Sequence, residues 1–106
     1  MGKRVYNKLV RDKIPQIIAS DGNRCATRVL SDEEYLKMVD AKLSEELNEY
    51  LESGSAEELA DLMEVIRAAA AARGYSYEQL EEIRAEKAEK RGGFEKRILL
   101  LEVEEV

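Results

Sequence analysis

The sequence predicts a small all-α fold, an antiparallel helical hairpin or bundle of three to four helices. Two observations lead to this fold class. Ala, Leu, Glu, Lys and Arg dominate the chain, and these residue types favour helix. In addition, Ser31, Ser55 and Ser76 are each followed three positions later by Glu or Gln. That spacing is typical of a capping box, which satisfies the first free N–H groups of a helix.

The expected elements follow in order along the chain. A short helix is expected around residues 10–19, and longer helices are expected at residues 32–52, 56–73 and 77–91. Each longer helix is followed by glycine, which favours the left-handed turn at a helix end. Residues 24–30 and 98–103 are apolar or β-branched enough for a minor short strand pair, and the sequence leaves open whether they pair.

The length of the chain sets its domain number. With 106 residues it forms a single domain, residues 1–106, and a domain of this size buries only about 60 to 70% of its unfolded surface. A partner subunit would add to that burial. We therefore expect a homodimer or homotetramer.

The charge balance excludes several classes of function. There are 23 acidic and 17 basic residues, a formal net charge of −6, whereas proteins that bind nucleic acid usually carry a basic excess. Histidine is absent and Cys25 is the single cysteine, so neither a Cys/His zinc site nor an intramolecular disulfide can form. No apolar run reaches the roughly 18 residues of a membrane span, and the N-terminus lacks a signal-peptide core. We expect a cytoplasmic protein that meets phosphate ligands locally or through a metal.

Carboxylates flank the predicted turn at Ser53-Gly54. Glu46 and Glu49 precede it on the first long helix, and Glu58 and Asp61 follow it on the second. So short a turn makes the helices antiparallel. When residues are counted outward from the turn on both helices, Glu46 lies opposite Asp61 and Glu49 lies opposite Glu58. At about 1.5 Å of rise per residue, these two rungs lie roughly 4 to 5 Å apart. The four acids are therefore expected to face one another.

Both helices also carry apolar stripes, and Glu46 and Glu58 lie only about 60 to 70° from the stripe centres. Carboxylates are rarely held against apolar surface unless they are paired or bound to metal. Hard oxygen ligands suit Mg²⁺, with Mn²⁺ as a substitute. The alternative is that Glu58 only closes the capping box begun by Ser55. The predicted stripes are Leu36, Val39, Leu43, Leu47 and Tyr50 on the first helix, and Leu59, Leu62, Val65, Ile66 and Ala69 on the second.

Three segments resemble the MazG-like all-α nucleoside triphosphate pyrophosphohydrolases of the phosphoribosyl-ATP pyrophosphohydrolase-like superfamily. Glu45-Glu46-x-x-Glu49 followed by Glu58-x-x-Asp61 is similar to the family signature. Tyr6 to Pro15 resembles the N-terminal motif of a short MazG-like subgroup, and Lys90 to Phe94 resembles its C-terminal motif. The two acidic motifs are closer together here than in the better-studied members, so no substrate is carried over from those members.

The resemblance implies Mg²⁺-dependent hydrolysis of a nucleoside triphosphate between its α- and β-phosphates, giving the monophosphate and pyrophosphate, as a house-cleaning reaction. It implies Glu46, Glu49, Glu58 and Asp61 as metal ligands, with Glu45 as an orienting or base group. The catalytic set is then Glu45, Glu46 and Glu49, and the choice of base between Glu45 and Glu49 stays open. The resemblance also implies a site completed across subunits.

Two basic clusters are candidates for binding the triphosphate. Lys87, Lys90 and Arg91 share one face at the end of the last predicted helix, beside a Gly-Gly pair whose N–H groups can approach phosphate. The other cluster comprises Asn7, Lys8, Arg11 and Lys13. Each has a structural alternative, because cations commonly complement a helix C-terminus and an amphipathic N-terminal segment keeps its charges in solvent.

Two other functions fit the same residues. A non-enzymatic helical interaction module would use the acidic ridge as a solvated or partner-binding surface. A phosphoribosyl-ATP pyrophosphohydrolase would use the metal site on another nucleotide. Stabilisation by Mg²⁺ separates the module from the enzymes, and pyrophosphate release across nucleotides separates the two enzymes.

Overall fold

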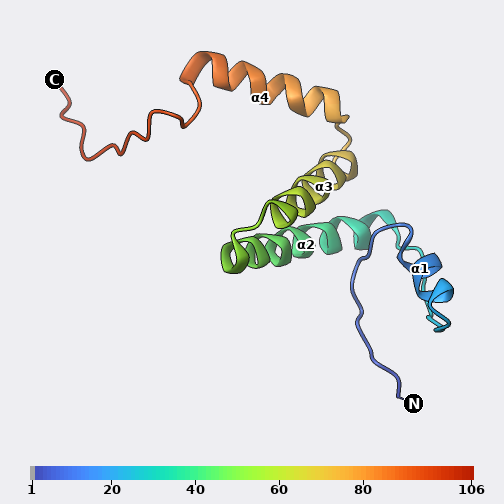
Figure 1. Cartoon of the computed structure of the whole chain (residues 1–106). Coiled ribbons are helices and arrows are strands. Elements are labelled where there is room, and N and C mark those ends of the chain that lie inside the picture. The colour runs from blue at the N-terminus through green and yellow to red at the C-terminus, as the bar shows by residue number, and fades with distance from the viewer. Residues whose placement is uncertain (1) are drawn as a thin grey trace.

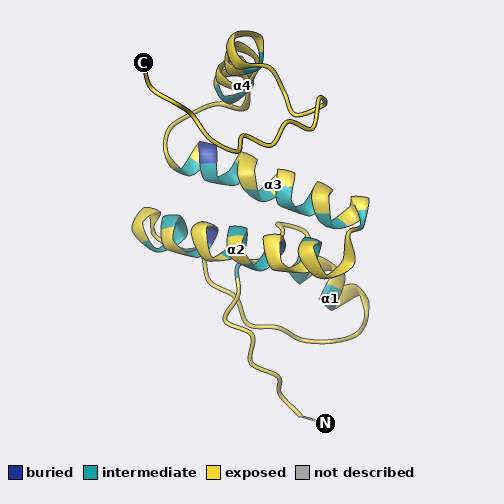
Figure 2. Cartoon of the chain, turned by 90° about the vertical axis from the view of Figure 1, so that its left-hand side faces the viewer, coloured by how far each residue is buried: buried dark blue, intermediate teal, exposed yellow. Residues whose placement is uncertain are grey.

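The fold consists of four helices in the part of the chain that the structure, a computed structural model, describes, residues 2–106. They are α1 (Ile14–Ser20), α2 (Asp32–Ser53), α3 (Ala56–Ala72) and α4 (Tyr77–Arg91). Helices α2 and α3 form an antiparallel hairpin, and α4 lies on the far side of α3 from α2 (Figures 1 and 2). The all-α prediction is confirmed, and the bounds of the three longer helices agree with the expected ones to within one residue.

Side-chain caps begin the long helices as the sequence predicts. Ser31 Oγ accepts a hydrogen bond from the Glu34 N–H at 3.2 Å, and Glu34 Oε1 accepts one from the Ser31 N–H at 3.2 Å. Ser76 and Gln79 form the same reciprocal pair at the start of α4. Gly54 ends α2 in the left-handed region (φ 65°) and donates its N–H to Tyr50 O at 2.7 Å. This turn sets the antiparallel course of α3.

The short helix begins later than predicted. It was expected from about residue 10, but α1 starts at Ile14. Pro15 explains the difference, because its ring would clash with the carbonyl of Arg11 in a continuing helix. That carbonyl instead accepts the N–H of Ile14 at 3.1 Å, in the turn that opens α1.

The strand pair left open by the sequence does not form. Residues 24–30 and 98–103 contain no strand, nor does any other part of residues 2–106. Residues 24–30 lie beside α1, whereas residues 98–103 lie in the C-terminal tail beyond α4 (Figure 1). A strand needs a neighbouring backbone for its N–H and C=O groups, and these segments are too far apart to provide one for each other.

The core of a single chain is thin. Val39 is completely buried and Ala70 is 8% exposed, and no other apolar side chain among the described residues is buried as deeply. The radius of gyration is 18.8 Å, whereas a compact domain of this length has about 13 Å. The hairpin seam is therefore the main packed contact in the chain.

One side of the hairpin is apolar and exposed. Leu47, Leu51, Leu59, Met63 and Ile66 are between 40% and 68% exposed. At about 100° per residue, these side chains lie on the same side of the α2–α3 seam, because they are displaced in the same sense from Glu46 and Glu58 on antiparallel helices. We call these five residues the hairpin apolar face. Leu59 and Ile66 belong to a stripe that was expected to be buried, and Leu47 to the apolar face of α2, but in a single chain they are 43%, 40% and 45% exposed.

Candidate metal centre

The hairpin brings three of the predicted acids together. One carboxylate oxygen each from Glu46 on α2 and from Glu58 and Asp61 on α3 lie within 4.8 Å of one another. Glu46 is 7% exposed and is the buried charged residue of the described chain. Three carboxylates this close repel one another unless cations neutralise them. The cluster therefore has the geometry and the charge to attract a cation.

Two oxygens of the cluster are unsatisfied. Glu46 Oε2 and Glu58 Oε2 are buried, and neither accepts a hydrogen bond from any group in residues 2–106. Buried polar atoms are nearly always paired, because an unpaired one loses its hydration without compensation. Burial and the adjacent charge of Glu49 both raise the pKa of Glu46 above its ordinary value. The two orphaned oxygens point to a group that completes this site.

Glu58 does not close a capping box, which was the alternative for this residue. Ser55 Oγ accepts the Glu58 N–H at 3.3 Å, but the Ser55 N–H donates to Ser53 Oγ at 3.2 Å. Glu34 and Gln79, at the same position of α2 and α4, both return a bond to their capping serine. Since Ser53 satisfies the Ser55 N–H, the Glu58 carboxylate is left for the cluster.

Three cations surround the acids. Arg11 Nη2 donates to Asp61 Oδ1 at 2.6 Å, and Lys8 Nζ donates to Glu45 Oε1 at 3.0 Å. Lys42 Nζ lies 3.4 Å from Glu45 Oε2 and 3.5 Å from Glu46 Oε1. The hydrogen bond from Lys8 is the main reason that the pKa of Glu45 is lowered. Within residues 2–106, no ion pair reaches Glu58.

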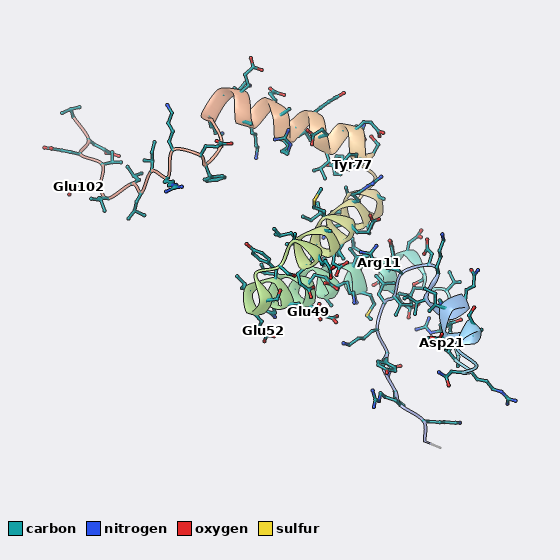
Figure 3. The ribbon with its side chains drawn as sticks, in the orientation of Figure 1. Arg11, Asp21, Glu49, Glu52, Tyr77 and Glu102 are labelled. Carbon is teal, nitrogen blue, oxygen red and sulfur yellow. The ribbon has the colours of Figure 1, made fainter. Side chains whose placement is uncertain are left out.

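Lys42 is a site residue that the sequence analysis missed. Its spacing gives the signal, because it precedes Glu45 by three residues and Glu46 by four, both of which share a helix face with it. Glu49 lies beside Glu46, where its charge raises the pKa of Glu46, but it is outside the three-residue group. Figure 3 shows Glu49 and Glu52 on the last part of α2 and Arg11 on the N-terminal segment that runs up to the hairpin.

The other predicted binding residues are divided between two places. Lys8 and Arg11 contact the acids directly, and Asn7, with φ 48°, and Lys13, which precedes α1, belong to the same exposed segment. Lys87, Lys90 and Arg91 lie on α4, which α3 separates from α2 (Figure 2). Together with Ile83 and Glu86 they line a shallow hollow of about 260 Å³. A single chain thus brings one basic cluster, but not the other, to the carboxylates.

Comparison with known proteins adds little to this geometry. No family model matches the chain. No solved structure matches it either. An uncharacterized protein of Mycolicibacterium smegmatis is 50% identical over 42 residues, which cover 40% of this chain and 43% of that protein. None of the four helices in residues 2–106 has the length and apolar character of a membrane span.

The residues of the cluster suit a hard divalent cation. All the available ligand atoms are carboxylate oxygens, and such sites favour Mg²⁺ or Mn²⁺ when water and phosphate oxygens complete the coordination. The unsatisfied oxygens of Glu46 and Glu58 are the observation that fits such an ion, because a bound cation would use both. Glu46, Glu58 and Asp61 would hold the ion, and Glu49 lies beside Glu46 outside this group.

Proposed function

We propose that this chain is a Mg²⁺-dependent nucleoside triphosphate pyrophosphohydrolase of the MazG-like kind, which releases pyrophosphate and leaves the monophosphate. The observation that carries the proposal is the pair of buried, unsatisfied oxygens on Glu46 and Glu58, two of the three clustered acids of the hairpin. A capping role does not account for Glu58, and a solvated ridge does not account for Glu46, which is 7% exposed. Both residues belong to the motifs that resemble the family.

The remaining side chains take roles that follow from their contacts. When bound, the ion would offset charge on the phosphate oxygens and ease deprotonation of the attacking water. Glu45 is held by Lys8 and Lys42, which lower its pKa and so make it a weak proton acceptor. We assign the base to Glu49, which is exposed and has no ion pair within residues 2–106. Asn7, Lys8, Arg11 and Lys13 would bind phosphate.

The proposal extends to the assembly. Lys87, Lys90 and Arg91 lie on α4, away from the carboxylate cluster of the α2–α3 hairpin (Figure 1), so they would serve the site of a second copy in a homodimer or homotetramer. The hairpin apolar face would supply the interface, because five apolar side chains there are 40% to 68% exposed. Removal of non-standard or surplus nucleotides in the cytoplasm is the biological role that fits this activity.

A pyrophosphate-release assay tests the proposal. The purified chain is supplied with millimolar Mg²⁺ and a panel of standard and modified nucleoside triphosphates, together with phosphoribosyl-ATP. Glu46→Gln should lower turnover at least about 100-fold, which corresponds to about 2.7 kcal/mol of lost transition-state stabilisation. Glu52→Gln, an exposed acid on the last turn of the same helix, is the matched control and should keep full activity. Release from phosphoribosyl-ATP alone would favour the histidine-pathway type of enzyme.

The same two variants separate an enzyme from an interaction module. Mg²⁺ should raise the melting temperature of the wild type and of Glu52→Gln, since a ligand that binds only the folded state stabilises it by mass action. Glu46→Gln should show no such rise. No pyrophosphate release from any nucleotide, together with a melting temperature that Mg²⁺ leaves unchanged in the wild type, would rule the enzyme out.

A further inference from the structure

The N-terminal segment, residues 2–13, runs up to the hairpin from a beginning that extends away from it (Figures 1 and 3). Two ion pairs join them, Arg11 with Asp61 across 50 residues of sequence and Lys8 with Glu45 across 37. Asp61 is also one of the three clustered acids. We propose that Arg11 is an exchangeable counter-ion of the metal site, bound to Asp61 in the ion-free protein and displaced when a divalent cation binds. This inference rests on the proposed metal site.

Arg11 and the cation compete for the same carboxylate. Arg11 Nη2 holds Asp61 Oδ1 at 2.6 Å. The three clustered oxygens lie within 4.8 Å of one another, and Mg²⁺ binds its ligands at about 2.0 to 2.1 Å. An ion that takes an oxygen from all three acids therefore draws on the same carboxylate that binds Arg11. In addition, a guanidinium and a divalent cation on one carboxylate repel each other.

The pair is weak enough to exchange. The side chain of Arg11 is 57% exposed and that of Asp61 is 41% exposed, and exposed ion pairs contribute little net stability. Arginine keeps its proton at every physiological pH, so it can leave Asp61 only by moving. The freed guanidinium, with its five donors, would remain beside the ion and meet the phosphate oxygens of the substrate.

Calorimetric titration of the 106-residue chain with Mg²⁺ tests this exchange. Arg11→Gln removes the competitor and should tighten the apparent Kd for Mg²⁺ about two- to fivefold, the range expected for an exposed ion pair. Arg4→Gln is the matched control, because it removes the same charge from the same exposed segment and Arg4 has no ion pair within residues 2–106. Far-UV circular dichroism checks that all variants keep their helix content.

Trypsin cleavage gives a second readout that needs no activity. Arg11 must enter the acidic pocket of the protease, so its bond to Asp61 should slow cleavage after Arg11 in the ion-free protein. Mg²⁺ should therefore speed cleavage after Arg11 relative to cleavage after Arg4, as followed by mass spectrometry. In Glu46→Gln, Mg²⁺ should leave this ratio unchanged.

The outcomes distinguish this inference from the metal site on which it rests. If Glu46→Gln binds Mg²⁺ as the wild type does, the metal site is wrong and the exchange fails with it. If Glu46→Gln loses Mg²⁺ binding but Arg11→Gln and Arg4→Gln have the same Kd, the metal site stands and the exchange alone is overturned. Weaker binding by Arg11→Gln would also overturn it, because Arg11 would then support the ion.

Discussion

Ser53 Oγ accepts the backbone N–H of Ser55 at 3.2 Å, and this bond does at α3 what a glutamate or glutamine side chain does at the starts of α2 and α4. The first turn of α3 is thereby capped without the carboxylate of Glu58. Because that carboxylate is released, it can lie in the hairpin seam against Glu46 and Asp61. The Ser53 hydroxyl thus takes over the capping hydrogen bond and leaves the Glu58 carboxylate available for the cluster.

Replacing that serine should weaken the metal site without touching a ligand. In Ser53→Ala the Ser55 N–H loses its partner, and Glu58 can turn back to form a capping box. We expect the apparent Kd for Mg²⁺ to weaken several-fold while the melting temperature of the ion-free protein changes little. Calorimetric titration measures the first quantity and differential scanning fluorimetry the second. Ser44→Ala, on α2 and without a side-chain hydrogen bond in the described residues, is the control. Equal Kd values in the two variants would contradict this account of Glu58.

The pairing of Arg28 with Glu34 should appear in the acid stability. Arg28 donates two hydrogen bonds to Glu34, at 3.0 and 2.6 Å, and together with Ser31 lowers the pKa of Glu34 from 4.5 to about 2. The folded state therefore holds Glu34 charged where the unfolded state takes up a proton. Its contribution to stability is present above about pH 4.5 and is lost as the pH falls toward 2.

Arg28→Gln should lower stability at neutral pH and flatten the loss between pH 4.5 and 2, because the pKa of Glu34 then returns toward its ordinary value. Urea unfolding at a series of pH values measures both changes. Arg24→Gln removes the same charge from the same loop and should behave as the wild type does. A wild-type slope in Arg28→Gln would show that the pair does not persist in solution.

Val39 should be the most sensitive apolar position of the hairpin. It is completely buried in the seam, so Val39→Ala removes buried carbon and leaves a cavity, at a cost of about 2 kcal/mol. For a chain of this size, that loss corresponds to a fall of about 10 °C in Tm. Val29→Ala, where the side chain is 97% exposed, should change Tm hardly at all. Equal Tm values for the two variants would place the core of the protein elsewhere.

The hairpin apolar face should control assembly. Met63 is 58% exposed at its centre, and Met63→Glu puts a charge that must be desolvated into any interface there. We expect the wild type to sediment as a multiple of 12.1 kDa and Met63→Glu to sediment as the monomer. Val29→Glu is the control, since it adds the same charge at a side chain that is 97% exposed outside the hairpin. A monomeric wild type would contradict the proposed interface.

The sequence by itself determined the helices and their connections. The serines that begin α2, α3 and α4 form their capping hydrogen bonds within one helical turn. Gly54 ends α2 in the left-handed conformation, which reverses the chain without a contact to distant residues. These interactions are local, so their spacing in the sequence is sufficient to predict them. The short turn also predicted that Glu46, Glu58 and Asp61 lie near one another, because it makes the two helices antiparallel.

Only the tertiary structure decided which groups neutralise those acids. Arg11 reaches Asp61 across 50 residues, and Lys8 reaches Glu45 across 37. Packing also decided that Leu59 and Ile66 stay exposed and that residues 24–30 and 98–103 remain apart. Such outcomes depend on which surfaces meet in space. Periodicity along one helix records where a side chain points and not what lies opposite it.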